Sequence, residues 1–340
     1  MSLSLADSFA GCDALTVDKI EEKSIKMPRA EGSRVPSTGL SEYEIFSVVE
    51  EMGAYPLARH FEGGFERNKH LTLEQVIYPY VESCIPVMVT IETEGERHGL
   101  VVVGHTFDRD SWWQQAQKWY YPYLKGDVTW IPSYMWVPDF IVHDDNFGPY
   151  LSVPRTLLAA TASHVVVPIP KICNAFLAGF EAESLVAGYL ALPDLFDFVV
   201  NKTRTTGLWK KPLEQLRGSG NRSAQIVLRP LLVSRDALLK HVKESEFSRE
   251  LYEAYQQTNL PAWMWLVEIS LPELYAHRKK IGEMIINPSC AEPHIHTGLE
   301  PLLALRILDV MVRGHNFRAP LIIPDIYPMP VLLHSTFEHG

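Results

Sequence analysis

Two short, strongly apolar segments between residues 87 and 106 constrain the fold of this chain more than any other feature. Val87 to Glu92 is rich in β-branched residues, and His98 to Thr106 is an apolar run too short for a buried helix. Glu94 and Gly95 supply a turn between the two segments. The pattern therefore predicts a β-hairpin in the core of a sheet.

Two helices are expected before this hairpin. Ser41 and Glu44 fit a capping box, and apolar residues recur at helical spacing between residues 45 and 52. Residues 73–84 also place their apolar side chains on one helical face. We expect a helix packed on an antiparallel sheet over residues 35–152.

A third strand, Phe140 to His143, ends in turn chemistry at Asp144, Asp145 and Asn146. We expect it to lie beside the hairpin, so that the strands of Val89, Val102 and Val142 are neighbours. Residues 108–137, between the hairpin and this strand, are strongly aromatic and are interpreted as an insertion.

At roughly 150 residues per domain, a chain of 340 residues is expected to form two domains. We place the first at residues 1–154 and the second, a mixed α/β domain of unknown role, at residues 155–340. The second half is expected to contain strands at 164–168, 225–233, 263–270 and 280–287, and helices at 175–192, 235–242 and 247–255. The fold class predicted for the whole chain is α+β.

Composition excludes several classes of partner. Lysine and arginine number 31 against 41 aspartate and glutamate, a formal net charge of −10, and no segment concentrates the basic residues. We therefore expect no nucleic acid and no membrane as a partner. The four cysteines are scattered and form no CxxC pair, which indicates reduced thiols and a cytoplasmic location.

The residues that carry chemistry are a histidine at the start of an apolar strand and carboxylates at the end of the next one. His98 opens the second hairpin strand, and Asp144 follows the third strand. In a thiol hydrolase a histidine takes the proton of a cysteine, and a carboxylate fixes the ring tautomer and stabilises the resulting cation. The missing partner is a cysteine earlier in the chain.

The run YVESCIPVMVTI, HGLVVVGHT and FIVHDDNFGPY resembles papain-like cysteine peptidases, and among them the bacterial double-glycine leader (bacteriocin-processing) peptidase domains. The resemblance covers roughly residues 35–152. It implies a papain-like helix-plus-antiparallel-sheet domain that acts on a peptide or protein substrate. It also implies that His98 is the catalytic base and Asp144 its orienting carboxylate, with Asp145 or Asn146 as alternatives to Asp144.

The nucleophile segment departs from this family. Members of the family carry a glutamine a few residues before the nucleophilic cysteine. In this chain the candidate cysteine upstream of His98 is Cys12, and no glutamine precedes it, because the first glutamine is Gln75. Asp13 places a negative charge beside Cys12, which raises the pKa of a thiol. We therefore expect that Cys12, the candidate nucleophile, is not positioned to attack, and that the nucleophile of the family lies upstream or is missing.

Two functions follow as alternatives. The first is a cysteine-peptidase-like thiol hydrolase that uses His98 and Asp144. The second is a non-catalytic binding or scaffolding protein on the same fold. Cys290, His294 and His296 are ligand-type side chains close together, but their spacing is not a common zinc pattern, so no metal or other cofactor is expected.

Overall fold

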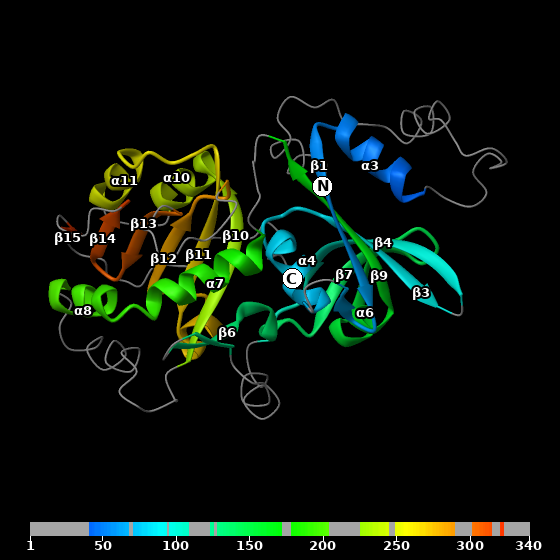
Figure 1. Ribbon diagram of the computed structural model, residues 1–340, viewed down its shortest axis with the longest axis horizontal. Coiled ribbons are helices and arrows are strands. Elements are labelled where there is room, and N and C mark those ends of the chain that lie inside the picture. Colours follow the sequence, from blue (N-terminus) through cyan, green and yellow to red (C-terminus); the bar gives the residue numbers. More distant parts are fainter. Residues whose placement is uncertain are drawn as a thin grey trace.

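Two β-sheets with a helix between them form the framework of the chain (Figure 1). The computed structural model describes residues 41–67, 71–93, 95–108, 123–125, 128–171, 178–203, 225–244, 249–289, 301–314 and 320–322. The helix α4 (Leu73–Glu82) contacts strands of both sheets, and α7 (Gly179–Leu190) packs beside α4 on the second sheet. The class is α+β, as predicted.

The first sheet is antiparallel throughout. Its strand order is β2 (Phe65–Glu66), β1 (Ala54–Glu62), β9 (Ala162–Pro170), β3 (Val87–Thr93), β4 (Glu96–His105), β7 (Asp139–Asp144) and β8 (Gly148–Pro154). Val87 pairs with Val102, and Val102 pairs with Val142. The predicted hairpin and its third strand are thereby confirmed.

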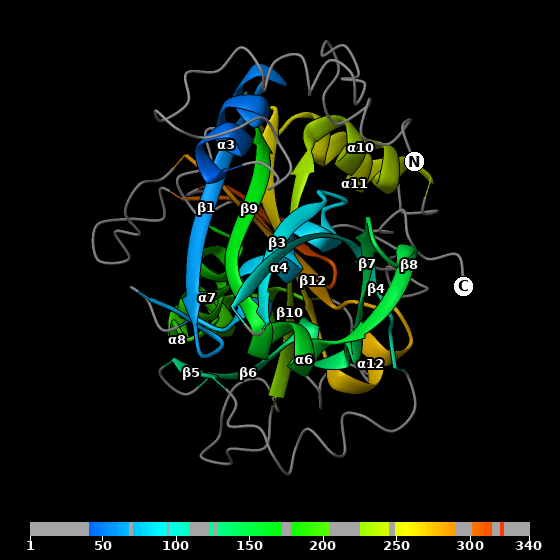
Figure 2. The same cartoon turned by 90° about the vertical axis from the view of Figure 1, so that its right-hand side faces the viewer.

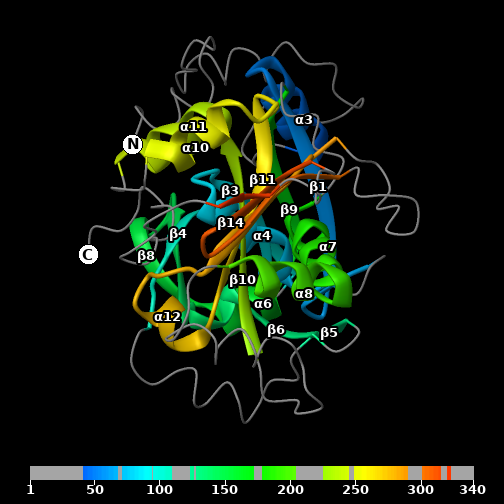
Figure 3. The same cartoon turned by 90° about the vertical axis from the view of Figure 1, so that its left-hand side faces the viewer.

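The second sheet contains most of the strands from the second half of the chain. Its order is β15 (Leu321–Ile322), β14 (Val310–Arg313), β13 (Leu302–Ile307), β12 (Gly282–Ile286), β11 (Trp263–Ser270), β10 (Gln225–Ser234), β6 (Val128–Pro132) and β5 (Tyr123–Lys125). The pairing of β6 with β10 is parallel, and the other neighbours are antiparallel. Two helices, α10 (Arg235–Glu244) and α11 (Arg249–Gln256), lie together at one end of this sheet (Figure 3) and pack on it through an apolar cluster.

The two sheets do not divide at residue 154, the predicted end of the first domain. β5 and β6, from the aromatic segment, belong to the second sheet, whereas β9 lies between β1 and β3 of the first. Each sheet therefore contains strands from both sides of residue 154. The remaining helices are α3 (Glu42–Glu51), the 3₁₀ helix η1 (Ser133–Trp136), α6 (Arg155–Thr161), α8 (Pro193–Lys202) and α12 (Pro272–Ala276).

Local sequence explains the two predicted helices of the first half. Ser41 and Glu44 form the capping box at the start of α3, with Glu44 Oε2 accepting from the Ser41 backbone N–H at 2.7 Å. Thr72 and Gln75 form a second capping box at the start of α4. α4 ends before Cys84, which has a positive φ of 61°.

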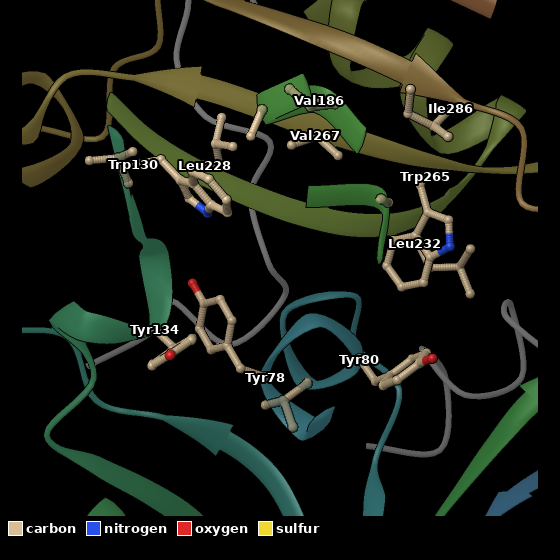
Figure 4. Packing of buried hydrophobic residues seen from close by; sticks show 14 of the residues in the cluster. Tyr78, Tyr80, Trp130, Tyr134, Val186, Leu228, Leu232, Trp265, Val267 and Ile286 are labelled. Atoms are coloured by element: carbon tan, nitrogen blue, oxygen red, sulfur yellow. The ribbon is translucent and has the colours of Figure 1, made fainter. Parts of the chain in front are cut away.

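Aromatic side chains of α4 fill the space between the sheets (Figure 4). The ring of Tyr80 lies edge-on to Trp265 of β11, with centroids 5.7 Å apart. Tyr78 lies 6.1 Å from the ring of Tyr134 in η1. Such edge-to-face pairs add to the stabilisation from area burial, so α4 joins the two sheets into one core.

A chain of buried charged side chains also connects the sheets. His105, at the end of β4, lies with Nε2 2.7 Å from Glu82 Oε1 of α4. The other carboxylate oxygen of Glu82 accepts from Arg229 Nη2 of β10 at 2.5 Å. Burial acts to raise the pKa of Glu82, but Arg229 and His105 hold it well below its ordinary value. The strand that carries His98 is therefore anchored at its far end.

The charged row continues across the second sheet. Arg229 pairs in register with Glu268, Glu268 with Glu283, and Glu283 with Arg306. Lys280 Nζ lies 2.6 Å from Glu268 and 3.3 Å from Glu283, and Arg306 binds Glu283 with two nitrogens. The two carboxylates Glu268 and Glu283 thus face each other, and Lys280 lies between them and binds both.

Close packing of β12 against β13 leads to one prediction. A Cβ atom on Gly282 would lie 2.3 Å from the backbone oxygen of Arg306, which belongs to a paired strand and has little freedom to move. Gly282→Ala is expected to lower the free energy of unfolding by about 3 kcal/mol, the upper end for overpacked cores. Urea denaturation measures this loss. The same substitution at Gly99, where a Cβ meets nothing within 4 Å, is the matched control.

Candidate functional site

The structure brings His98 and Asp144 together at one end of the first sheet. His98 lies near the start of β4 and Asp144 is the last residue of β7, and the two strands run antiparallel with Leu100 opposite Asp144. His98 Nε2 lies 3.1 Å from Asp144 Oδ1 and 3.4 Å from Asp145 Oδ1. Figure 2 shows β4 and β7 side by side near the edge of the sheet, with β8 outermost.

The turn after β7 fixes the Asp144 carboxylate. Asp144 Oδ1 accepts from the backbone N–H of Asn146 at 2.7 Å and of Phe147 at 3.1 Å. Desolvation acts to raise the pKa of Asp144, but these backbone donors and His98 lower it below its ordinary value. Asp144 is therefore an ionised carboxylate with a fixed position, as an orienting group requires.

The two ring nitrogens of His98 face different groups: Nε2 faces the carboxylates of Asp144 and Asp145, and Nδ1 faces Asn146. Nε2 lies 3.1 Å from Asp144 Oδ1, but the geometry is not that of a well-aligned hydrogen bond. Nδ1 lies 3.5 Å from Asn146 Nδ2, at the long limit for a hydrogen bond. The His98 side chain is 27% exposed, so a substrate or a nucleophile can reach it. With the ring proton on Nε2, toward Asp144, Nδ1 is the basic nitrogen, and a thiol would replace its long contact with Asn146.

The candidate nucleophile Cys12 lies outside the described residues. Cys84, a half-buried cysteine, follows α4 and precedes β3, which starts at Val87. His98 pairs with Ile91, so the four residue steps from Val87 to Ile91, about 13 Å of strand, separate His98 from the start of β3. Cys84 is therefore not a partner for His98.

Two exposed aromatic side chains lie on the β7–β8 hairpin. Phe147 is next to the His98 pair, because its backbone N–H binds Asp144, whereas Tyr150 contacts His143, which points to the other face of the sheet. Phe147 is 79% exposed and Tyr150 is 60% exposed, although large apolar side chains are usually buried. Tyr150 has a positive φ of 61° and its ring lies edge-on to His143, with centroids 4.7 Å apart. The sequence pattern identified this segment only as a turn and missed these two rings as a contact surface.

The same cluster has the composition of a weak cation site. One ligand atom from each of His98, Asp144 and Asp145 lies within 4.8 Å of the others. A histidine with two carboxylates suits a divalent ion. However, Asp144 already accepts two backbone hydrogen bonds, so the arrangement is fully accounted for by an ion pair and a turn.

Comparison with protein-family models, with curated proteins and with solved structures finds no match for this chain. Among the described helices, none has the length and apolar character needed to cross a membrane.

Proposed function

We propose that this chain is a thiol hydrolase of the papain-like type that cleaves peptide or amide bonds, with His98 as the general base and Asp144 as the orienting group. The observation that carries the proposal is the 3.1 Å contact between His98 Nε2 and a carboxylate held by two backbone N–H groups. A base and its orienter on adjacent rigid strands are two of the three parts of a nucleophilic site.

In the proposed reaction His98 Nδ1 takes the proton of a cysteine thiol, and the thiolate attacks the carbonyl carbon of the substrate. The imidazolium then gives this proton to the leaving amine, and water hydrolyses the thioester that remains. Asp144 stabilises the imidazolium while it exists, because its charge is fixed 3.1 Å from Nε2. The exposed ring of Phe147, in the turn that holds Asp144, supplies apolar surface for a peptide side chain.

The alternative function is a non-catalytic protein that binds peptides at the same place. The exposed ring of Phe147 beside Asp144 favours it, because it offers a contact surface that requires no nucleophile. Both functions take a peptide or protein partner and differ in whether a reactive thiol faces His98.

Thiol alkylation followed by peptide mapping separates the two functions. If the hydrolase is present with Cys12 as its nucleophile, Cys12 reacts with iodoacetamide much faster than Cys84. His98→Ala is then expected to slow the labelling of Cys12 by about 100-fold, the lower end for a general base. Asp144→Asn slows it by a smaller factor, because the ring keeps its place but loses the charge that stabilises the imidazolium.

His277 is an exposed histidine that follows α12, and His277→Ala is the matched control, expected to leave the labelling rate unchanged. Equal and slow labelling of Cys12 and Cys84, unaffected by His98→Ala, would contradict the hydrolase and leave the peptide-binding function.

A further inference from the structure

A second cluster of ligand-type side chains lies on the other face of the first sheet. His60 of β1 and His164 of β9 are directly paired across adjacent strands, and Glu42 lies in the first turn of α3. One ligand atom from each of the three residues lies within 4.8 Å of the others. Figure 2 shows α3 beside the neighbouring strands β1 and β9.

Strand alternation places this cluster away from the proposed hydrolase site. Phe61 and Val165, the residues that follow His60 and His164, point into the core between the sheets. Because successive side chains point to opposite faces, His60 and His164 point outward. His98 shares its face with the core residues Leu100 and Val102, so the two clusters occupy opposite faces of the sheet.

The hydrogen bonds around His164 fix the nitrogen that faces outward. Ser163 Oγ donates to the backbone oxygen of Thr90 at 3.2 Å, so its proton is already used. The same Oγ lies 3.0 Å from His164 Nδ1 and must accept from it. Nδ1 therefore carries the proton and Nε2 of His164 keeps a free lone pair. A hydrogen bond that sets the tautomer of a ligating histidine is a recurrent feature of metal sites.

The positions of the other two groups complete a set of ligands. His60 Nε2 lies 3.6 Å from Glu42 Oε1, too far for a hydrogen bond and about the separation of two ligands around one ion. The rings of His60 and His164 stand at 83° to each other with centroids 4.7 Å apart. Both His60 and Glu42 are partly exposed, so small side-chain rotations bring their atoms to bonding distance.

We propose that Glu42, His60 and His164 bind a divalent transition-metal ion of the zinc class. Two imidazoles and one carboxylate suit zinc better than calcium or magnesium, which prefer oxygen ligands. Three protein ligands leave a coordination position for water or a further ligand. The ion joins the first turn of α3 to two strands and adds to the packing of this helix on the sheet.

Calorimetric titration of the full chain with Zn²⁺ tests the proposal. The unaltered chain binds one ion at this site, and His60→Ala or His164→Ala each weaken this binding by more than about 100-fold, beyond the effect of losing an outer partner. Ser163→Ala weakens it by roughly 10-fold, because the His164 tautomer is no longer fixed. With Co²⁺ in place of Zn²⁺, the spectrum shows bands of the metal ion without a thiolate charge-transfer band.

His277→Ala and the double variant His294→Ala/His296→Ala are controls and keep the affinity of the unaltered chain. His60 is exposed, so its replacement leaves the fold intact, which circular dichroism verifies. Zn²⁺ binding that survives His60→Ala and His164→Ala, or a titration without saturable binding, overturns the proposal. Neither result bears on the alkylation of Cys12.

Discussion

Arg229→Met is expected to lower the free energy of unfolding by about 3–5 kcal/mol, the range for breaking a buried ion pair from one side. Arg229 is 1% exposed and binds Glu82 at 2.5 Å and Glu268 at 2.7 Å. Methionine fills much of the same volume but supplies no charge. Glu82 and Glu268 then lose the guanidinium that they share and stay buried. Glu82 still contacts His105, and Glu268 still contacts Lys280.

Urea denaturation of the Arg229→Met variant measures this loss. Arg249→Met is the matched control, since Arg249 forms an exposed ion pair with Glu253 on α11 and its replacement costs less than about 0.5 kcal/mol. Replacing Arg229, Glu82 and Glu268 together by apolar residues is expected to recover part of the loss, because no charge is then left buried. Equal stabilities of Arg229→Met and Arg249→Met would show that the buried row contributes little.

A second large effect is expected from Glu183, a buried carboxyl on α7. Its Oε1 accepts from Trp130 Nε1 at 2.7 Å, and burial raises its pKa to about 8 in spite of this hydrogen bond. The group is therefore protonated in the folded protein at neutral pH, whereas in the unfolded chain its pKa is near 4.5. At a pH between these two pKa values, Glu183 therefore takes up a proton when the chain folds.

The sign of the pH dependence follows directly. Since the folded state binds more protons than the unfolded state, stability falls as pH rises from about 4.5 to 8, by at most about 5 kcal/mol. Glu183→Gln keeps an acceptor for Trp130 and removes the titration, so the variant is expected to be the more stable protein at pH 8. Denaturant unfolding over this pH range checks the prediction, with Glu244→Gln, exposed at the end of α10, as the control. Parallel pH profiles of Glu183→Gln and the unaltered chain would contradict it.

Acid acts on other groups in the opposite direction. Burial acts to raise the pKa of Glu283, but Arg306 and Lys280 hold it well below its ordinary value, as Arg229 and His105 do for Glu82. The ionised forms of Glu82 and Glu283 stabilise the folded protein fully at pH values above the pKa of glutamate in the unfolded chain. This stabilisation is lost as the pH falls toward the lower pKa values of the folded protein. Stability is therefore expected to decline toward both acid and alkaline pH.

Local patterns in the sequence were sufficient for many of the elements. The capping box of Ser41 and Glu44 marks the start of α3, and the apolar runs at 225–233 and 263–270 match β10 and β11 within a residue. In these segments the residue pattern of a single helix or strand, together with the turn residues at its ends, is enough to predict the element. β1 was missed, because Ala54–Glu62 contains Pro56 and charged residues and its pairing with β9 is not encoded locally.

A charged residue inside an apolar run implies a buried partner, which the periodicity of the run does not identify. Arg229 interrupts the apolar run of β10, and this break indicates only that the segment does not span a membrane. Its partners Glu82 and Glu268 come from distant parts of the chain. A buried charge requires a partner, but the sequence does not identify which one.

The two histidine clusters differ in how far sequence could find them. His98 and Asp144 lie on strands β4 and β7, which the sequence analysis placed side by side, so their contact was predicted and their 3.1 Å separation confirms it. Their catalytic role stays a prediction. His60 and His164 come together only because β9 enters the first sheet beside β1, and no local pattern indicates that pairing.

The place of β9 also has a consequence for synthesis on the ribosome. β1 and β3 emerge before β9, yet both are its hydrogen-bonded neighbours in the finished sheet. Until residue 170 has been released, the facing edges of β1 and β3 present unpaired backbone groups, which favour association with other chains. We therefore expect nascent chains that stop between β8 and β9 to be retained by chaperones, and those that include β9 to be released.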